Sequence, residues 1–271
     1  MGRPRQLPRP EEAASSATPG ARRVSVRAAG APSGSPHTTQ AATDLAMLLR
    51  SRQFCLSGEG ALLSRVASNL QTFGGAIADE APAWIGTGVA PEGSVAVALG
   101  DRAGALGPHS FGFLNNVDGV APLAAPLTER PRRGAVAWVV PRRDGVAEVA
   151  RVVCGGDLGA SWMISVGDGD RVEVMRFLAR DPATRAILLA VGRGVRPQTL
   201  LPVLAEKPTV LLELPSVSGR DSALLRAVAR RGGAVVTGDL EEWLAHAALL
   251  DALGDGAAAL TQTVASRRAV T

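Results

Sequence analysis

From about Gly134 to Leu253 the sequence alternates short apolar runs with amphipathic runs, five times in succession. The apolar runs, which we predict to be β-strands, span residues 135–140, 161–166, 186–191, 209–214 and 234–236. The amphipathic runs, which we predict to be α-helices, span residues 144–153, 171–179, 197–204, 220–230 and 239–253. The strands are apolar along nearly their whole length, which is typical of parallel strands that helices cover on both faces. This region is therefore predicted to form a parallel α/β sheet.

A shorter unit precedes this sheet in the sequence. Residues 53–57 are predicted to form a strand, and an amphipathic run over 61–70 is predicted to form a helix. The turn between them is Gly58-Glu59-Gly60. A strand, a glycine turn and a helix in this order open a Rossmann-type domain. Only one further strand, over 94–99, is clear, so this domain is predicted to be small and truncated.

The predicted organisation has two folded domains between two flexible ends. Its parts are a disordered tail over 1–42, a Rossmann-like domain over 45–121, a proline-rich linker over 122–133, the α/β domain over 134–254 and a flexible tail over 255–271. The first forty residues lack apolar periodicity and carry six arginines and two glutamates. Their net charge of +4 equals that of the whole chain, so the residues after the first forty carry equal numbers of basic and acidic side chains. We therefore expect no nucleic-acid partner.

Several classes of protein are excluded by what the sequence lacks. No apolar run approaches the roughly 20 residues that a membrane-spanning helix needs, and no apolar signal-peptide core follows the first arginines. Cys55 and Cys154 stand alone, without the spacing of metal ligands, so we predict reduced thiols and no metal site. These observations predict a cytoplasmic protein that does not enter a membrane.

Five short motifs follow one another between residues 105 and 253. They are G-P-H-S-F-G at 107–112, S-V-G-D at 165–168, R-D-P-A-T-R-A-I-L-L at 180–189, K-P-T-V at 207–210 and G-D-L-E-E-W at 238–243. In order and spacing they resemble motifs of NDP-forming acyl-CoA synthetases, a family that includes the succinyl-CoA ligase alpha subunits and the ADP-forming acetyl-CoA synthetases. The resemblance implies a five-stranded parallel flavodoxin-like sheet with helices on both faces, preceded by a small truncated Rossmann-like domain.

The same resemblance implies a chemistry and a cofactor. In such enzymes a nucleotide phosphorylates a histidine, the phosphate passes to an acid, and coenzyme A displaces it to form a thioester. A separate ATP-grasp chain loads the nucleotide in two-subunit relatives, which would make this chain part of a hetero-oligomer. The expected coenzyme A site draws on the glycine turn of the first domain and on the loop after the first strand of the second domain. Its candidate residues are Ser57, Gly58, Gly60, Arg142, Arg143 and Gly145.

The relay itself has no counterpart in the sequence. The family carries its phosphorylated histidine in a loop after the fourth strand, whereas residues 215–219 here lead straight into the next helix. The family's glutamate after the third strand is replaced by Gly192 or Arg193, and its hydroxyl-bearing turn after the first strand is replaced by residues 141–145. The three histidines of the chain, His37, His109 and His246, lie elsewhere. No catalytic residue is therefore predicted.

Arginines are frequent after the predicted strands. Arg142, Arg143, Arg193, Arg196 and Arg220 all lie at the expected carboxyl edge of the sheet. They could bind a phosphate, the pyrophosphate of coenzyme A or an acidic loop of a partner. Arginine makes up all but one of the 29 basic residues of this chain, so arginines at exposed loops need no function to explain them. We favour that second interpretation.

Two other functions with the same topology are excluded by residues at the strand ends. A response-regulator receiver needs an aspartate after the third strand and a lysine after the fifth, where this chain has Arg193 and Thr237. A flavodoxin that binds FMN needs aromatic side chains in these loops, and none is present. Two hypotheses stay open. The chain is either a divergent CoA-ligase-like subunit without the relay, which binds coenzyme A or a partner, or an active subunit that forms acyl-CoA thioesters together with an ATP-grasp chain.

Overall fold

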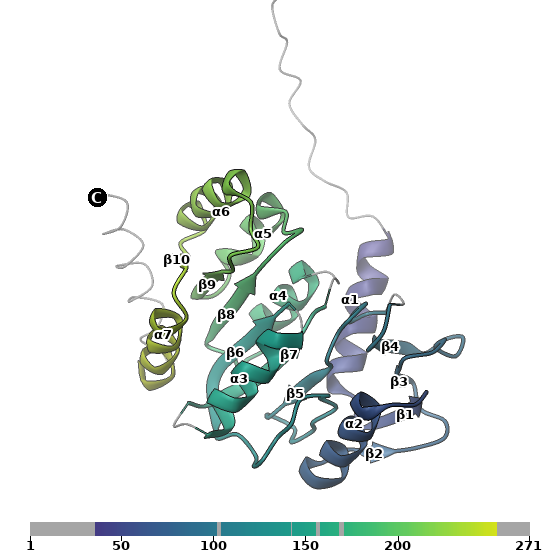
Figure 1. Cartoon of the computed structure of the whole chain (residues 1–271). Helices are drawn as coiled ribbons and strands as arrows, with labels where there is room; N and C mark the ends of the chain where they lie inside the picture. The colour runs from purple at the N-terminus through teal and green to yellow at the C-terminus, as the bar shows by residue number, and fades with distance from the viewer. Residues whose placement is uncertain (1–35, 102–103, 142, 156–157, 168–170, 254–271) are drawn as a thin grey trace, which may run out of the picture. The chain divides into compact units, whose positions relative to one another are not determined.

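The computed structural model describes residues 36–101, 104–141, 143–155, 158–167 and 171–253, all within one compact unit that begins at Ser35 (Figure 1). The helices are α1 Pro36–Arg50, α2 Ala61–Phe73, α3 Arg143–Gly155, α4 Arg171–Arg180, α5 Pro197–Leu204, α6 Gly219–Arg231 and α7 Leu240–Leu253. The strands are β1 Gln53–Ser57, β2 Ala76–Ile77, β3 Ala83–Gly86, β4 Val95–Ala98, β5 Phe113–Asn115, β6 Arg133–Val140, β7 Ala160–Ser165, β8 Ala186–Val191, β9 Thr209–Glu213 and β10 Val235–Thr237. No helix within the described ranges is long and apolar enough to cross a membrane.

The first sheet has four parallel strands in the order β2-β1-β3-β4. The strand β1 lies between β2 and β3, with Phe54 opposite Ile77 on one side and Ala83 on the other. The strands β3 and β4 are buried at every residue. The helix α2 follows β1 and packs on it through an apolar stripe that includes Val66 and Leu70. This sheet is the small, truncated Rossmann-like unit that the sequence predicts.

The second sheet has six strands in the order β10-β9-β8-β6-β7-β5. Five of them are parallel and follow the flavodoxin order, as the sequence predicts. The sixth, β5, runs antiparallel to β7, with Leu114 opposite Met163. Three residues are too few to show a period, so this edge strand could not be recognised in the sequence.

Helices cover both faces of the second sheet (Figure 1). The helix α3 packs on β6 and β7, and α7 packs on β6, β8 and β9. The helices α4, α5 and α6 pack against one another in a row on the other face. Neighbouring residues of β9 separate the two faces, since Leu212 lies on the side of α7 while Glu213 pairs with Arg226 of α6.

The helix α1 corrects one expectation. The disordered tail was predicted to extend to residue 42, but α1 begins at Pro36, so that prediction was wrong for residues 36–42. Leu45, Leu48 and Leu49 are buried where α1 packs against α4, β4 and β5. This stripe secures the helix, and its partners lie far away in the sequence, so local composition could not reveal it. Residues 1–35 and 254–271 lie outside the described ranges, and with them most of both predicted tails.

The segment predicted to be a linker, 122–133, is buried at its start and mostly exposed from residue 126 onward. Residues 122–125 are buried, and the buried side chain of Asn69 donates hydrogen bonds to the carbonyls of Leu123 and Ala125 at 2.6 and 2.9 Å. The start of this segment therefore packs within the core beside α2. The division into domains at 45–121 and 134–254 stays a prediction.

Candidate functional site

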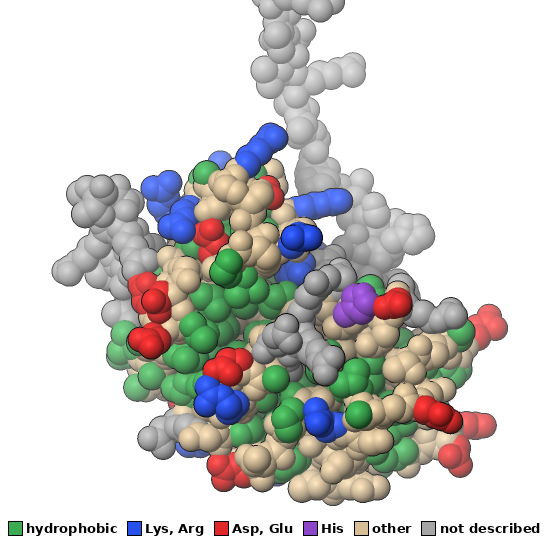
Figure 2. All heavy atoms as spheres, viewed as in Figure 1, with side chains coloured by type: hydrophobic (Ala, Val, Ile, Leu, Met, Phe, Trp, Pro, Cys, Tyr) green, Lys and Arg blue, Asp and Glu red, His purple; other side chains and the backbone are tan. Residues whose placement is uncertain are grey.

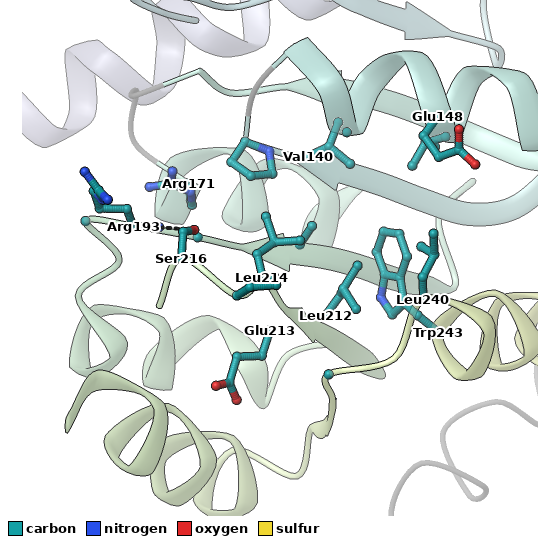
Figure 3. Close-up of a pocket in the computed structure, with 18 residues that line it drawn as sticks. Val140, Glu148, Arg171, Arg193, Leu212, Glu213, Leu214, Ser216, Leu240 and Trp243 are labelled. Atoms are coloured by element: carbon teal, nitrogen blue, oxygen red, sulfur yellow. Dashed lines mark hydrogen bonds between the residues drawn. The ribbon is translucent and has the colours of Figure 1, made fainter. Parts of the chain in front are cut away.

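A cavity of about 990 Å³ opens at the carboxyl edge of the second sheet (Figure 3). Parallel strands bring their carboxyl ends to one edge, so the loops after β6, β8 and β9 all contribute to it. The chain leaves β6 and β8 toward neighbouring strands on opposite sides, β7 and β9. Such a reversal of strand order is where open α/β sheets bind their ligands. The position of the cavity therefore follows from the topology.

The wall of the cavity is mainly apolar on the side of α3 and α7. Six apolar side chains line it there: Val140, Val149, Leu212, Leu214, Leu240 and Trp243. The space-filling view shows apolar side chains gathered over the carboxyl ends of β8 and β9 (Figure 2). This surface suits the hydrocarbon part of a ligand.

The loops after β8 and β9 are tied to each other at the other end of the cavity. The backbone N–H of Arg193 donates a hydrogen bond to the hydroxyl of Ser216 at 3.1 Å. A side chain at Gly192 would meet that hydroxyl at 3.1 Å, so the absence of a side chain lets the loops approach. Arg171, at the start of α4, also lines this end.

Two glutamates line the cavity, and each has an arginine partner outside it. Glu148 accepts hydrogen bonds from Arg151, one turn further along α3, and this contact lowers the pKa of the Glu148 carboxyl. Glu213 lies 3.0 Å from the guanidinium of Arg226 on α6. Both carboxylates are therefore neutralised from the outside of the cavity.

The chemistry of a phosphohistidine relay is not present in the described wall of the cavity. Its lining residues include no histidine, cysteine or lysine. The Nδ1 of His246 lies 2.7 Å from the carbonyl of Glu242 within α7, and the Nδ1 of His109 lies 3.4 Å from the carboxylate of Asp101. Burial, with a smaller contribution from Glu129, raises the pKa of the Cys154 thiol to about 11, which makes it a poor nucleophile. Among the described residues, no group of three potential metal ligands exists either.

The residues predicted for a coenzyme A site fall into two places. Gly145 lines the cavity, Arg143 begins α3, and Arg142 lies outside the described residues. Ser57, Gly58 and Gly60 lie instead at the end of β1, in the first sheet. The cavity therefore combines Gly145, which follows β6, with the loops after β8 and β9. Ser57, Gly58 and Gly60 do not line it.

The glycine turn after β1 has a geometry that needs glycine. Gly58 and Gly60 have φ angles of 113° and 117°, and a side chain at Gly58 would meet the hydroxyl of Thr87 at 2.4 Å. Gly60 caps α2 without a side-chain hydrogen bond, so the first N–H groups of that helix have no partner from a cap. An open helix N-terminus of this kind attracts anions, whereas the exposed Glu59 opposes them.

The sequence predicted some of the residues that line this cavity but not others. Among the edge arginines whose side chains the structure describes, Arg193 lines the cavity, whereas Arg196 and Arg220 do not. Arg171 and Trp243 were missed. Trp243 lies in the motif at 238–243, so its residue type was visible, but its place at the cavity depends on how α7 crosses the sheet.

Comparison with known proteins supports the fold. No protein-family model matches the sequence, and no curated protein matches it. Among solved structures, a Pyrococcus horikoshii protein is 19% identical with a TM-score of 0.61, over 75% of this chain and 61% of its own. The dinucleotide-forming acetyl-coenzyme A synthetase 1 of Ca. Korarchaeum cryptofilum is 15% identical with a TM-score of 0.62, over 77% of this chain and 62% of its own.

An ATP citrate lyase from Methanothrix soehngenii, in complex with citrate and coenzyme A, is more distant. It is 12% identical with a TM-score of 0.51, over 84% of this chain and 52% of its own. This chain thus spans about three fifths of the length of the first two structures and half of the third. Identities this low establish the fold alone. The chain is therefore CoA-ligase-like in fold and divergent in sequence.

Proposed function

We propose that this chain is a CoA-ligase-like subunit that binds coenzyme A and does not carry out a phosphohistidine relay. The observation that supports this most directly is the described wall of the cavity. Where the family resemblance would place a hydroxyl turn, a glutamate and a histidine, the cavity is lined by Gly145, Gly192 and Ser216 among others. A site can bind a ligand with such residues, but its described lining has no histidine to accept the phosphate of the relay.

The glycine turn after β1 supports the coenzyme A half of the proposal. The turn leads into the uncapped N-terminus of α2, where unpaired N–H groups and the helix dipole favour a pyrophosphate. The similar ATP citrate lyase has coenzyme A bound, which fits this reading. We further propose that the chain works with an ATP-grasp partner chain, and in the cytoplasm, where its free thiols Cys55 and Cys154 would stay reduced.

Calorimetric titration with coenzyme A tests the binding. Ala61 is exposed in the first turn of α2, so Ala61→Glu adds a negative charge next to the expected pyrophosphate. An acidic residue there also stabilises the helix, so the fold is retained. We expect Ala61→Glu to weaken binding by about tenfold and the neutral, isosteric Ala61→Gln to have little effect. No heat at millimolar coenzyme A, or equal effects of the two substitutions, would contradict the proposal.

The absence of the relay needs a separate experiment. The purified chain is incubated with γ-labelled ATP, an ATP-grasp chain, coenzyme A and simple acids, and then analysed for phosphate that is labile in acid and stable in base. We expect none on this chain. If such phosphate forms, the active-ligase hypothesis is correct instead, and the variants His37→Gln, His109→Gln and His246→Gln would identify the acceptor.

A further inference from the structure

The outer side of α7 exposes apolar side chains that no described element covers. The inner side of this helix packs on β6, β8, β9 and β10, and Figure 1 shows α7 at the margin of the second sheet. Of the six large apolar side chains that are exposed in the described ranges, three lie on this helix: Leu240, Leu249 and Leu253. Leu240 lines the cavity, whereas Leu249 and Leu253, 44% and 40% exposed, do not. Apolar side chains that cluster at a surface mark an interaction site.

The two outer leucines belong to a continuous stripe along the helix. Its members are all exposed and occupy positions i, i+3, i+4, i+7 and i+8 of one helix face. This α7 stripe consists of Ala245, Ala248, Leu249, Ala252 and Leu253. The buried inner side of α7 is apolar too, and a helix that is apolar on both sides is normally covered on both. The three alanines would let the backbone of a second helix approach closely.

Charges of opposite sign border the two ends of the α7 stripe. Asp239 and Glu241 are exposed at the start of the helix. Arg132 and Arg133 are exposed at the start of β6, and the guanidinium of Arg132 contacts the carboxylate of Asp251 near the end of the helix. The surface is therefore acidic at one end, apolar in the middle and basic at the other end.

We infer that the α7 stripe binds the same stripe of a second copy of this chain, with the two helices antiparallel about a two-fold axis. This pairing places Leu249 of the two copies opposite each other and Ala245 opposite the partner's Leu253. It also brings the acidic start of each helix toward the partner's Arg133. A parallel pair would instead place Glu241 of both copies side by side, where they repel. The antiparallel surface is self-complementary, as a two-fold contact requires.

Sedimentation equilibrium of the whole chain, over a range of protein concentrations, tests the inference. We expect a monomer–dimer equilibrium. Leu249→Glu should raise the dissociation constant of the dimer at least about a hundredfold, because it removes two buried leucines and places two carboxylates opposite each other. The control is Ile77→Glu, at a 45% exposed side chain on β2, which should leave the dissociation constant unchanged. Urea denaturation should show that both variants remain folded.

Disulfide cross-linking tests the antiparallel arrangement. Under mild oxidation Leu249→Cys should form a cross-linked dimer with itself. Ala245→Cys and Leu253→Cys should cross-link to each other when the two proteins are mixed, and more strongly than either does with itself. The unsubstituted chain, which contains Cys55 and Cys154, measures the background.

Reversal of charge tests the contact between the acidic and basic ends. Glu241→Arg and Arg133→Glu should each weaken the dimer by several-fold, because each places like charges together in both halves of the contact. A chain that carries both substitutions should recover the original dissociation constant, since the pair is restored with its signs exchanged. If the double variant were weaker than either single variant, the two ends would not meet.

A chain that stays monomeric at every concentration would overturn the inference. A dimer that Leu249→Glu leaves intact, or that Ile77→Glu weakens equally, would also overturn it. Preferential cross-linking of Ala245→Cys with itself would indicate a parallel pair and would contradict the proposed arrangement. If the chain were monomeric and bound an ATP-grasp chain through Leu249, the α7 stripe would belong to that partner instead. The coenzyme A titration is independent of these results, so the proposed function and the dimer can fail separately.

Discussion

The ammonium group of Lys207 donates a hydrogen bond to the backbone carbonyl of Asp181 at 2.5 Å, which joins the start of β9 to the end of α4. It also donates to the carbonyls of Leu178 and Thr184, at 2.8 and 2.6 Å. The carboxylate of Asp181 accepts hydrogen bonds from Trp162 and Thr184 at 2.9 and 2.7 Å. Two of the motifs that carry the family resemblance therefore meet in a structural network at the amino edge of the sheet, away from the cavity.

We expect Lys207→Met to lower the free energy of unfolding by about 2–3 kcal/mol, because three carbonyls would lose a charged donor. Burial lowers the pKa of Lys207, and the negative charge of Asp181 opposes part of that shift. Denaturation by urea measures the effect. Arg180→Met, at an exposed position on α4, is the control and should change stability by less than about 0.5 kcal/mol. Equal effects of the two substitutions would show that the network contributes nothing.

The glycine turn after β1 allows a second matched comparison. Gly58→Ala adds a methyl group that would lie 2.4 Å from the Thr87 hydroxyl, whereas nothing lies within 4 Å of the same group at Gly60. Both backbones have positive φ, so Gly60→Ala should lower the free energy of unfolding only by the strain of that conformation, about 1–3 kcal/mol. Gly58→Ala should lower the free energy of unfolding by clearly more than Gly60→Ala does, because its methyl group also meets the Thr87 hydroxyl. In the double variant with Thr87→Ala the excess should disappear, and urea denaturation of the four proteins would show whether it does.

The stability of the protein should fall in alkaline solution because of Cys154. Burial raises the pKa of this thiol from 9.0 to about 11 in the folded chain. Below pH 9 the thiol is neutral in both states and its contribution to stability is complete. Between pH 9 and 11 only the unfolded chain loses the proton, so about 2–3 kcal/mol is lost across that interval. Urea midpoints measured against pH should show this fall, Cys154→Ala should reduce it, and Cys55→Ala should not. Parallel profiles for all three proteins would contradict the assignment.

Packing of α1 against the rest of the chain is testable with two neighbouring residues. Leu48 is fully buried, and Leu48→Ala should lower the free energy of unfolding by about 2–4 kcal/mol. Met47 is 42% exposed, and Met47→Ala should have an effect below about 0.5 kcal/mol. If Leu48→Ala were as mild as Met47→Ala, α1 would not be part of the core.

Most of the second sheet was predictable from the sequence. The strand at 186–191 and the helix at 197–204 occur with the predicted bounds, as does β1 at 53–57. The other strands and helices predicted for that sheet differ from the structure by one or two residues at an end, whereas β5 was not predicted. Continuous apolar runs and helical periodicity are local signals, so they can be recognised without knowing which elements pack against one another. That no histidine, glutamate or hydroxyl turn occupies the positions expected from the family resemblance could also be read from the sequence, because it concerns residue types at strand ends.

The tertiary structure alone decided three things. It placed β5 beside β7, where the hydroxyl of Ser110 donates to the carbonyl of Ser165 at 2.6 Å. It extended α1 back to Pro36 by packing Leu48 on distant elements. It also set Trp243 and Arg193 at opposite ends of one cavity. The sequence shows the type of each residue but not that both line the same cavity. Each of these depends on contacts between segments far apart in the chain, and the sequence determines such contacts only through the complete fold.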